Sequence, residues 1–185
     1  MLSPEMKLKL LIENRPWEGE PNNEQWVDER TGLPCRIRRH PEHLHLCGYV
    51  GVNKDHSFFG LTDEDFTGVH VHGGLTYAGT EDDGIHWFGF DCAHAGDLSP
   101  GILIHLLESR ISGYVDYLRD EEYRTWDYVK AEVERMAMGI DIAADALANV
   151  ETLAAAKEAV RSGASVTDEL AKRGYVCKKG GLTKC

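Results

Sequence analysis

The chain has 185 residues, of which 42% are hydrophobic and 28% charged, a length and composition typical of one globular domain with or without an appendage. Acidic residues outnumber basic ones by 31 to 20, giving a formal net charge of -11. A surface this negative repels phosphate backbones, so general nucleic-acid binding is not expected. A small nucleotide held in a local pocket remains compatible with this charge.

The cysteines and the N-terminal residues bear on the expected cellular compartment of the protein. The chain has five cysteines, an odd number, and no CxxC pair, which argues against a disulfide framework and a zinc knuckle. The apolar residues near the N-terminus are interrupted by Lys9 and Glu13 and are too few for a signal peptide. No stretch approaches the roughly twenty apolar residues that span a bilayer. We therefore expect a soluble protein of the cytoplasm, without membrane contact.

The first predicted elements form a hairpin. Residues 15–34 contain prolines and glycines and are expected to form a loop. Residues 35–39 and 44–52 are rich in strand-forming residues, and the segment between them is typical of a turn. His40, His43 and His45 cluster at this turn, where we expect them to be exposed to solvent.

Two further strands are predicted over 69–78 and 85–91, joined by the polar, glycine-bounded loop 79–84. With the first hairpin they give an antiparallel sheet of about four strands in the N-terminal half. The periodicity then becomes helical. Ser99 and Pro100 are a good N-cap and first residue for one helix, and 121–138 form a second, amphipathic helix that we expect to stop at Gly139.

The predicted fold class is therefore α+β, with the sheet packed against helices from the C-terminal half. Residues 1–140 form the body, and 141–185 form a helical appendage that ends in a basic tail without regular structure. The alanine-rich appendage has several possible roles. It could be a docked helical hairpin, a homo-oligomerisation element, a partner-binding segment, or a simple cover for the body.

The first candidate functional segment covers 70–77. On a strand, alternate residues point to the same side, so His70 and His72 would share a face and form half of a metal site. The alternative is a pair of surface histidines.

Four more residues of this segment are candidates for ligand binding. Gly73 and Gly74 would let a ligand or backbone approach closely, re-aim His72 through a bulge, or offer N–H groups to an anion. Thr76 and Tyr77 could donate hydrogen bonds to a ligand, or could be ordinary strand formers.

The second candidate segment covers 86–97 and ends a buried aromatic strand with polar residues at three-residue steps. Asp91, His94 and Asp97 would face one side if the chain turns helically there. Carboxylate and imidazole suit a divalent metal or a general acid/base pair. Alternatively, Asp97 is a loop or cap residue before Ser99, and Asp91 caps the turn.

The two segments reinforce each other. Pairing about a loop centre near Asp82 puts Asp91 opposite Gly73, which brings His72, Asp91 and His94 to a common point as catalytic candidates. The metal-ligand candidates are the wider set His70, His72, Asp91, His94 and Asp97. Cys92 is either a nucleophile activated by a histidine or a small buried hydrophobic residue.

The segments 47–52, 71–77, 87–97 and 128–134 together resemble a family of uncharacterised proteins from bacteriophages and prophages. The strings HGGLTY at 72–77 and WFGFDCAHAGD at 87–97 carry most of the resemblance, which extends over roughly residues 26–138. The segment 102–120 and the tail after Gly139 depart from the compact version. The resemblance implies a viral context, in which nucleotide metabolism or interference with host defence would be plausible tasks.

Three functions follow as hypotheses. The first is a metal-dependent hydrolase that acts on a small polar substrate, such as a nucleotide, through Asp91, His94 and His72. The second is a non-catalytic protein that sequesters a nucleotide-like ligand or a host defence protein. The third is a structural or assembly factor in which the polar cluster only stabilises a turn.

Overall fold

The computed structural model describes residues 3–63, 69–109 and 117–163, together with 165, 169, 172, 175–178 and 181–184. The chain divides into two compact units, Met1–Ile140 and Asp141–Cys185. Helix α5, Trp126–Ser162, begins in the first unit and ends in the second.

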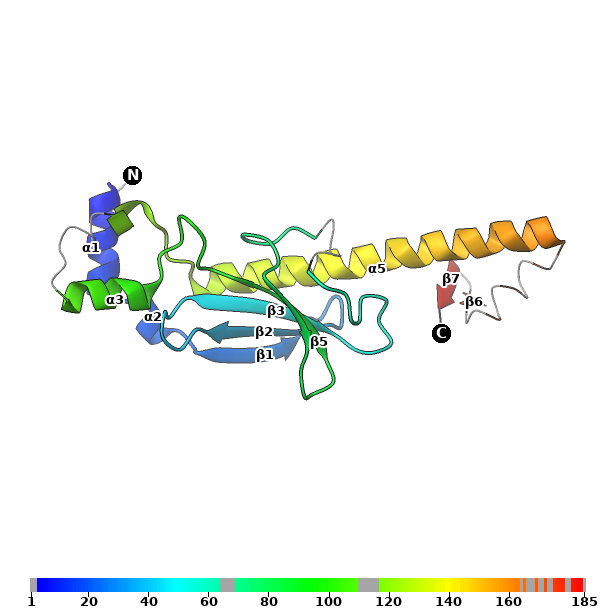
Figure 1. Ribbon diagram of the computed structural model, residues 1–185, viewed down its shortest axis with the longest axis horizontal. Helices are drawn as coiled ribbons and strands as arrows, with labels where there is room; N and C mark the ends of the chain where they lie inside the picture. The colour runs from blue at the N-terminus through cyan, green and yellow to red at the C-terminus, as the bar shows by residue number, and fades with distance from the viewer. Residues whose placement is uncertain are drawn as a thin grey trace. The chain divides into compact units, whose positions relative to one another are not determined.

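The first unit contains a five-stranded antiparallel sheet, which confirms the predicted α+β class (Figure 1). The strand order is β1-β2-β3-β5-β4. The strands are β1 Asn23–Val27, β2 Pro34–Arg39, β3 Leu46–Val52, β4 Tyr77–Thr80 and β5 His86–Asp91. Strand β1 lies in the segment predicted to be a loop. In β1, only Glu24 and Trp26 are partly buried. The alternation of buried and exposed residues in this edge strand is therefore too short to be recognised as a strand from the sequence.

The predicted strand over 69–78 is wrong for most of its length, because β4 begins only at Tyr77. Gly73 and Gly74 both have positive φ, at 66° and 92°, a conformation that interrupts a strand. The register is also shifted by two residues from the expected one, since Tyr77 pairs with Gly89. The candidate residues before Tyr77 therefore lie on a loop.

The helices of the first unit are α1 Pro4–Asn14, α2 Pro16–Gly19, α3 Pro100–Glu108, the 3-10 turn η1 Tyr117–Asp120 and the first part of α5. Helix α3 begins at Pro100, as predicted. Helix α5 begins later than predicted, because the Thr125 hydroxyl accepts a hydrogen bond from the N–H of Tyr128 at 3.3 Å, in the manner of an N-cap. It also continues through Gly139, where a Cβ atom would lie 3.2 Å from Val69 Cγ1.

The main core lies between one face of the sheet and the first part of α5, which crosses that face in Figure 1. The predicted apolar face of this helix is confirmed, since Val129, Val133 and Met136 are fully buried. Gly48, on β3, lies against the helix. A Cβ atom there would lie 2.5 Å from Val133 Cγ2 and 2.6 Å from the Phe90 ring.

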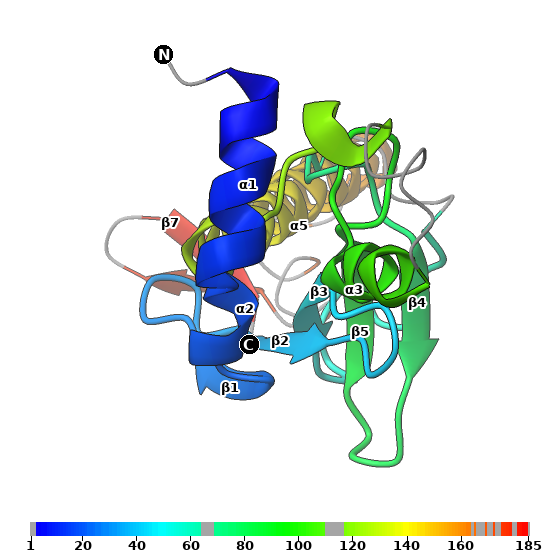
Figure 2. The same cartoon turned by 90° about the vertical axis from the view of Figure 1, so that its left-hand side faces the viewer.

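A second core joins α1, α2, α3 and η1 at one end of the unit (Figure 2). Arg39, at the end of β2, is buried beside it and donates to Tyr123 Oη at 3.0 Å and Glu20 Oε2 at 2.8 Å. The second core contains the buried side chains Leu8, Trp17, Leu98, Leu103, Leu118 and Tyr123.

The second unit contains the rest of α5 and a short antiparallel hairpin, β6 Tyr175–Lys178 and β7 Gly181–Lys184. The basic tail therefore has regular backbone structure where we expected none. Gly163 has a positive φ of 72°, a left-handed conformation suited to ending α5. Among the helices that the structure describes, none is both long and apolar enough to cross a membrane.

Replacing Gly48 with alanine tests the packing of the sheet on α5. Because the added methyl group would overlap Val133 and Phe90, we expect Gly48→Ala to lower the free energy of unfolding by about 1–3 kcal/mol. Urea denaturation measures this change. Gly19→Ala is the matched control, since nothing lies within 4 Å of its Cβ position. Equal stability of the two variants would contradict the packing described.

Candidate functional site

Three of the predicted polar residues meet in one cluster, formed by His72, His94 and Asp97. His72 Nε2 lies 2.6 Å from Asp97 Oδ2, and His94 Nδ1 lies 3.6 Å from the same oxygen. One ligand atom from each of the three residues lies within 4.8 Å of the other two. The N–H of Asp97 donates to the His94 carbonyl at 2.9 Å, so the chain turns between them, as their three-residue spacing predicts.

Asp97 is the buried centre of this cluster, with 5% of its surface exposed. Its Oδ1 accepts a hydrogen bond from Arg124 Nε at 2.8 Å, and its Oδ2 accepts one from the His94 N–H at 3.1 Å. Burial alone would raise the pKa of this carboxyl, but the hydrogen bonds from Arg124 and His72 outweigh it and hold the pKa below its usual value. Asp97 is therefore an anion at neutral pH.

His72 is fixed by contacts from the first turns of α5. Its Nδ1 lies 2.9 Å from Tyr128 Oη, and its backbone N–H donates to Glu132 Oε2 at 3.0 Å. The ionised Asp97 carboxylate can only accept hydrogen bonds, so a neutral His72 carries its proton on Nε2. The Nδ1 of His72 then accepts a hydrogen bond from the Tyr128 hydroxyl. Both ring nitrogens therefore have partners.

His94 differs, because its Nδ1 is buried and makes no hydrogen bond with any residue in the described part of the chain. This nitrogen lies between two carboxylates, 3.6 Å from Asp97 Oδ2 and 3.8 Å from Asp91 Oδ1. A buried imidazole nitrogen without a partner is costly, and one held between two anions is well placed to bind a cation.

Gly73 makes room for the His94 ring. A Cβ atom at Gly73 would lie 2.1 Å from His94 Cε1, whereas nothing lies within 4 Å of the Cβ position of Gly74. The N–H of Gly74 donates to the Val71 carbonyl at 3.1 Å, so it is already engaged and is not free for an anion. The glycine pair thus shapes the loop around His94.

A cavity of about 370 Å³ lies beside the cluster and includes Thr76, Tyr77 and Asp91 in its lining. Asp91 links the two features, since it accepts a hydrogen bond from the Thr76 hydroxyl at 2.9 Å and lies near His94. Burial raises the pKa of Tyr49 to about 12 and that of Cys47 to about 11. Both groups therefore keep their protons at neutral pH. The remaining lining residues are His40, His45, Cys47, Tyr49, Phe90 and Ala93.

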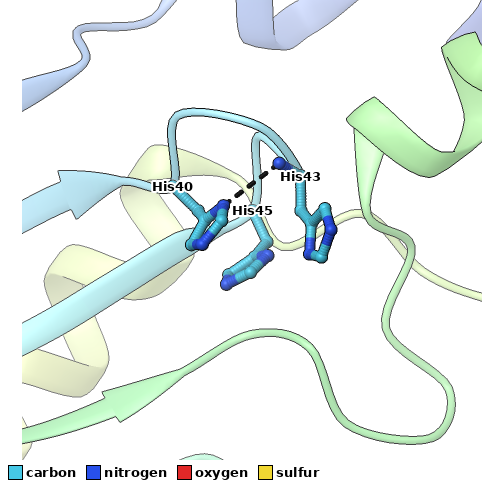
Figure 3. A group of neighbouring side chains, drawn as sticks. All are labelled: His40, His43 and His45. Carbon is cyan, nitrogen blue, oxygen red and sulfur yellow. Dashed lines mark hydrogen bonds between the residues drawn. The ribbon is translucent and has the colours of Figure 1, made fainter.

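The turn between β2 and β3 brings three imidazoles together (Figure 3). The rings of His43 and His45 each have their centre 4.9 Å from that of His40. The expectation that all three are exposed is wrong for His45, which is 7% exposed. Its carbonyl accepts a hydrogen bond from the His40 N–H at 2.8 Å, which closes the turn. Burial, and then the charge of His40, lower the pKa of His45.

Two other sequence candidates do not join the cluster. His70 is exposed and lies on the loop before Tyr77, so it does not share a strand face with His72. Cys92 is buried, and burial raises its pKa far above that of a free thiol, which fits the small hydrophobic role and not the nucleophile.

Sequence reasoning did not identify Arg124, Tyr128 and Glu132 as parts of the site. Tyr128 and Glu132 are four residues apart on α5, a spacing that places them on one helix face. The spacing predicts that the two polar side chains share a helix face, but it does not predict which loop that face contacts.

Comparison of the chain with models of protein families, with curated proteins and with solved structures finds no match.

Replacing Asp97 with asparagine tests its role as a buried anion. We expect Asp97→Asn to lower the free energy of unfolding at pH 7 by about 2 kcal/mol or more, because Arg124 and His72 lose a charged partner. Folding lowers the pKa of Asp97, so the carboxylate contributes its full stabilisation above the ordinary carboxyl pKa. That stabilisation is lost as the pH falls through the lower pKa of the folded state. Denaturation at pH 7 and pH 3 should show the gap between variant and parent narrowing in acid. A gap that is the same at both pH values would contradict this role.

Proposed function

We propose that His72, His94 and Asp97 hold a divalent metal ion in a hydrolase that acts on a small polar substrate. The observation that supports this most is the buried Nδ1 of His94, which has no hydrogen-bond partner among the described residues and lies 3.6 Å from Asp97 Oδ2. Two imidazoles and one carboxylate are a ligand set typical of catalytic zinc sites, which keep a further position open for water or substrate. Manganese and iron are also compatible with these ligands.

The distances within the cluster require one adjustment for metal binding. Two ligands bound to the same tetrahedral ion at roughly 2.0–2.1 Å lie about 3.3 Å apart. The separation of His94 Nδ1 and Asp97 Oδ2, 3.6 Å, is already near this value. His72 Nε2 and Asp97 Oδ2 are 2.6 Å apart and would have to separate as the ion replaces the proton between them. Metal affinity should therefore fall as the pH falls.

The substrate would occupy the neighbouring cavity. Asp91 borders this cavity and lies 3.8 Å from His94 Nδ1, which suits a general base or acid that acts beside the metal. A bound divalent ion would supply an activated water molecule. Thr76 and Tyr77 would orient the substrate, and the edge-to-face rings of Tyr49 and Tyr77 offer an aromatic surface for a nucleobase.

The sequence resemblance to phage and prophage proteins supports a setting for this activity. We propose that the protein acts in the cytoplasm of the host cell, either in nucleotide metabolism or by removing a small signal of host defence. In either setting, the proposed reaction is the hydrolysis of a nucleotide-like substrate.

A second function is favoured by the hydrogen bonds of His72. Both of its ring nitrogens already have partners, Tyr128 at 2.9 Å and Asp97 at 2.6 Å, so the network is also complete at this residue without a metal. The cavity would then belong to a non-catalytic protein that sequesters a nucleotide-like ligand. Saturable binding without product formation would identify this function.

Metal analysis of matched variants tests the proposed centre. We expect His94→Ala to hold one equivalent less of zinc, manganese or iron than the parent protein, and His70→Ala to hold as much as the parent, because His70 is an exposed histidine outside the cluster. Gly73→Ala should lose the same ion, since its methyl group would displace the His94 ring, whereas the methyl group of Gly74→Ala, also at a positive φ, would meet nothing within 4 Å. Inductively coupled plasma mass spectrometry gives the stoichiometry. The same metal content in all five proteins would rule out this centre.

A measurement of substrate turnover distinguishes the hydrolase from the non-catalytic binding protein. We expect Asp91→Ala to keep its fold and its metal but to lose at least a hundredfold in kcat/KM, because the acid/base group is removed. A screen of nucleotides and phosphoesters with product detection provides the assay, and circular dichroism checks the fold. Binding of a nucleotide with no product in the metal-loaded parent protein would favour sequestration over hydrolysis.

A further inference from the structure

The turn that carries His40, His43 and His45 forms a second group of potential metal ligands, separate from the His72 cluster. One ring nitrogen from each residue lies within 4.8 Å of the other two. Figure 3 shows that the three side chains project from one short turn and gather on the same side of it. No carboxylate belongs to the group.

The backbone of the turn is held in part by hydrogen bonds between backbone groups. The His40 N–H donates to the His45 carbonyl at 2.8 Å, and the Leu44 N–H donates to the His40 carbonyl at 3.0 Å. Leu44 has a φ of 59°, a left-handed conformation that is rare for a leucine and lies between two of the histidines. The arrangement of the imidazoles is therefore built into the fold.

Helix α3 also supports the turn. The N–H of Gly101 donates to the His43 carbonyl at 2.8 Å. A Cβ atom at Gly101 would lie 2.1 Å from the Glu42 carbonyl oxygen, so only glycine allows the helix to approach this closely. The histidine turn is thereby fixed to the body from outside the hairpin.

His45 gives the second, independent indication of a ligand. Its side chain is buried, and its Nδ1 makes no hydrogen bond with any residue that the structure describes. A buried ring nitrogen without a partner is uncommon in folded proteins and calls for an explanation such as an ion or a water molecule. His45 also lines the 370 Å³ cavity, together with His40.

We propose that His40, His43 and His45 form a binding site for a transition-metal ion of the zinc, copper and nickel class. Imidazole nitrogens favour these ions, whereas magnesium and calcium require oxygen ligands. Three protein ligands leave a position open in a tetrahedral site. Because two of the three histidines line the cavity, that position is available to a molecule bound in it.

His40 must change its contacts to take part. Its Nδ1 accepts the backbone N–H groups of Glu42 at 3.3 Å and His43 at 3.1 Å, so the neutral ring carries its proton on Nε2. Coordination through Nδ1 exchanges these two long hydrogen bonds for a bond to the metal. Glu42 and His43 are exposed, so water can satisfy the N–H groups that are released.

The test measures zinc and copper binding in full-length protein that also carries His94→Ala, which removes the other proposed centre. In this background we expect His43→Asn and His40→Asn each to weaken zinc affinity at least tenfold in calorimetric titrations. His43 is exposed, so its replacement leaves the core intact. An asparagine at 40 can still accept the backbone N–H groups of the turn, which separates coordination from turn capping. His70→Asn, at an exposed histidine outside the turn, is the control and should bind as the parent does.

Electron paramagnetic resonance of the copper-loaded protein gives a readout independent of affinity. We expect nitrogen hyperfine structure from more than one imidazole, which is lost or reduced in His43→Asn. Zinc affinities that are equal in the parent, His43→Asn and His70→Asn would overturn the site. If His43→Asn weakens zinc binding but His40→Asn does not, the assignment of three histidine ligands is overturned.

Discussion

The hydrogen bonds of the Asp97 carboxylate join three parts of the first unit that are distant in sequence. His72 comes from the loop before β4, the His94 N–H from the turn after β5, and Arg124 from the segment that leads into α5. A buried carboxylate is tolerated only when its charge and its lone pairs are satisfied, so each segment must be in place for the others to pack. The position of His94 beside the cavity depends on this arrangement.

Most polar atoms of the cluster are held by contacts from the surrounding elements. Tyr128 and Glu132 belong to the part of α5 that packs on the sheet, and they fix His72 from both its ring and its backbone. Gly73 leaves the space that the His94 ring fills. The feature that points to a cation is His94 Nδ1, which is buried and has no hydrogen-bond partner in the part of the chain that the structure describes.

The sequence was informative where a signal is local. Alternation predicted the β2–β3 hairpin, the Ser99-Pro100 pair predicted the start of α3, and the apolar periodicity identified the buried face of α5. The three-residue spacing of His94 and Asp97 predicted their proximity correctly, because a single turn of chain brings them together.

The sequence was misleading where distant contacts decide the structure. Gly139 does not end α5, since it lies mid-helix where the loop residue Val69 passes close to the helix. The segment before Tyr77 resembles a strand, but the successive positive φ angles of Gly73 and Gly74 make it a loop around the His94 ring. Arg124 and Tyr128 could not be assigned to the site, because their partners lie 27 and 56 residues away.

The proposed metal centre can be tested with a crystal structure of the protein soaked with zinc, through an anomalous difference map recorded at the zinc absorption edge. We expect a peak about 2.0–2.2 Å from His94 Nδ1 and Asp97 Oδ2, with His72 Nε2 moved away from Asp97 to complete the ligand set. An intact His72–Asp97 hydrogen bond, with no anomalous peak near His94, would contradict the proposed metal centre.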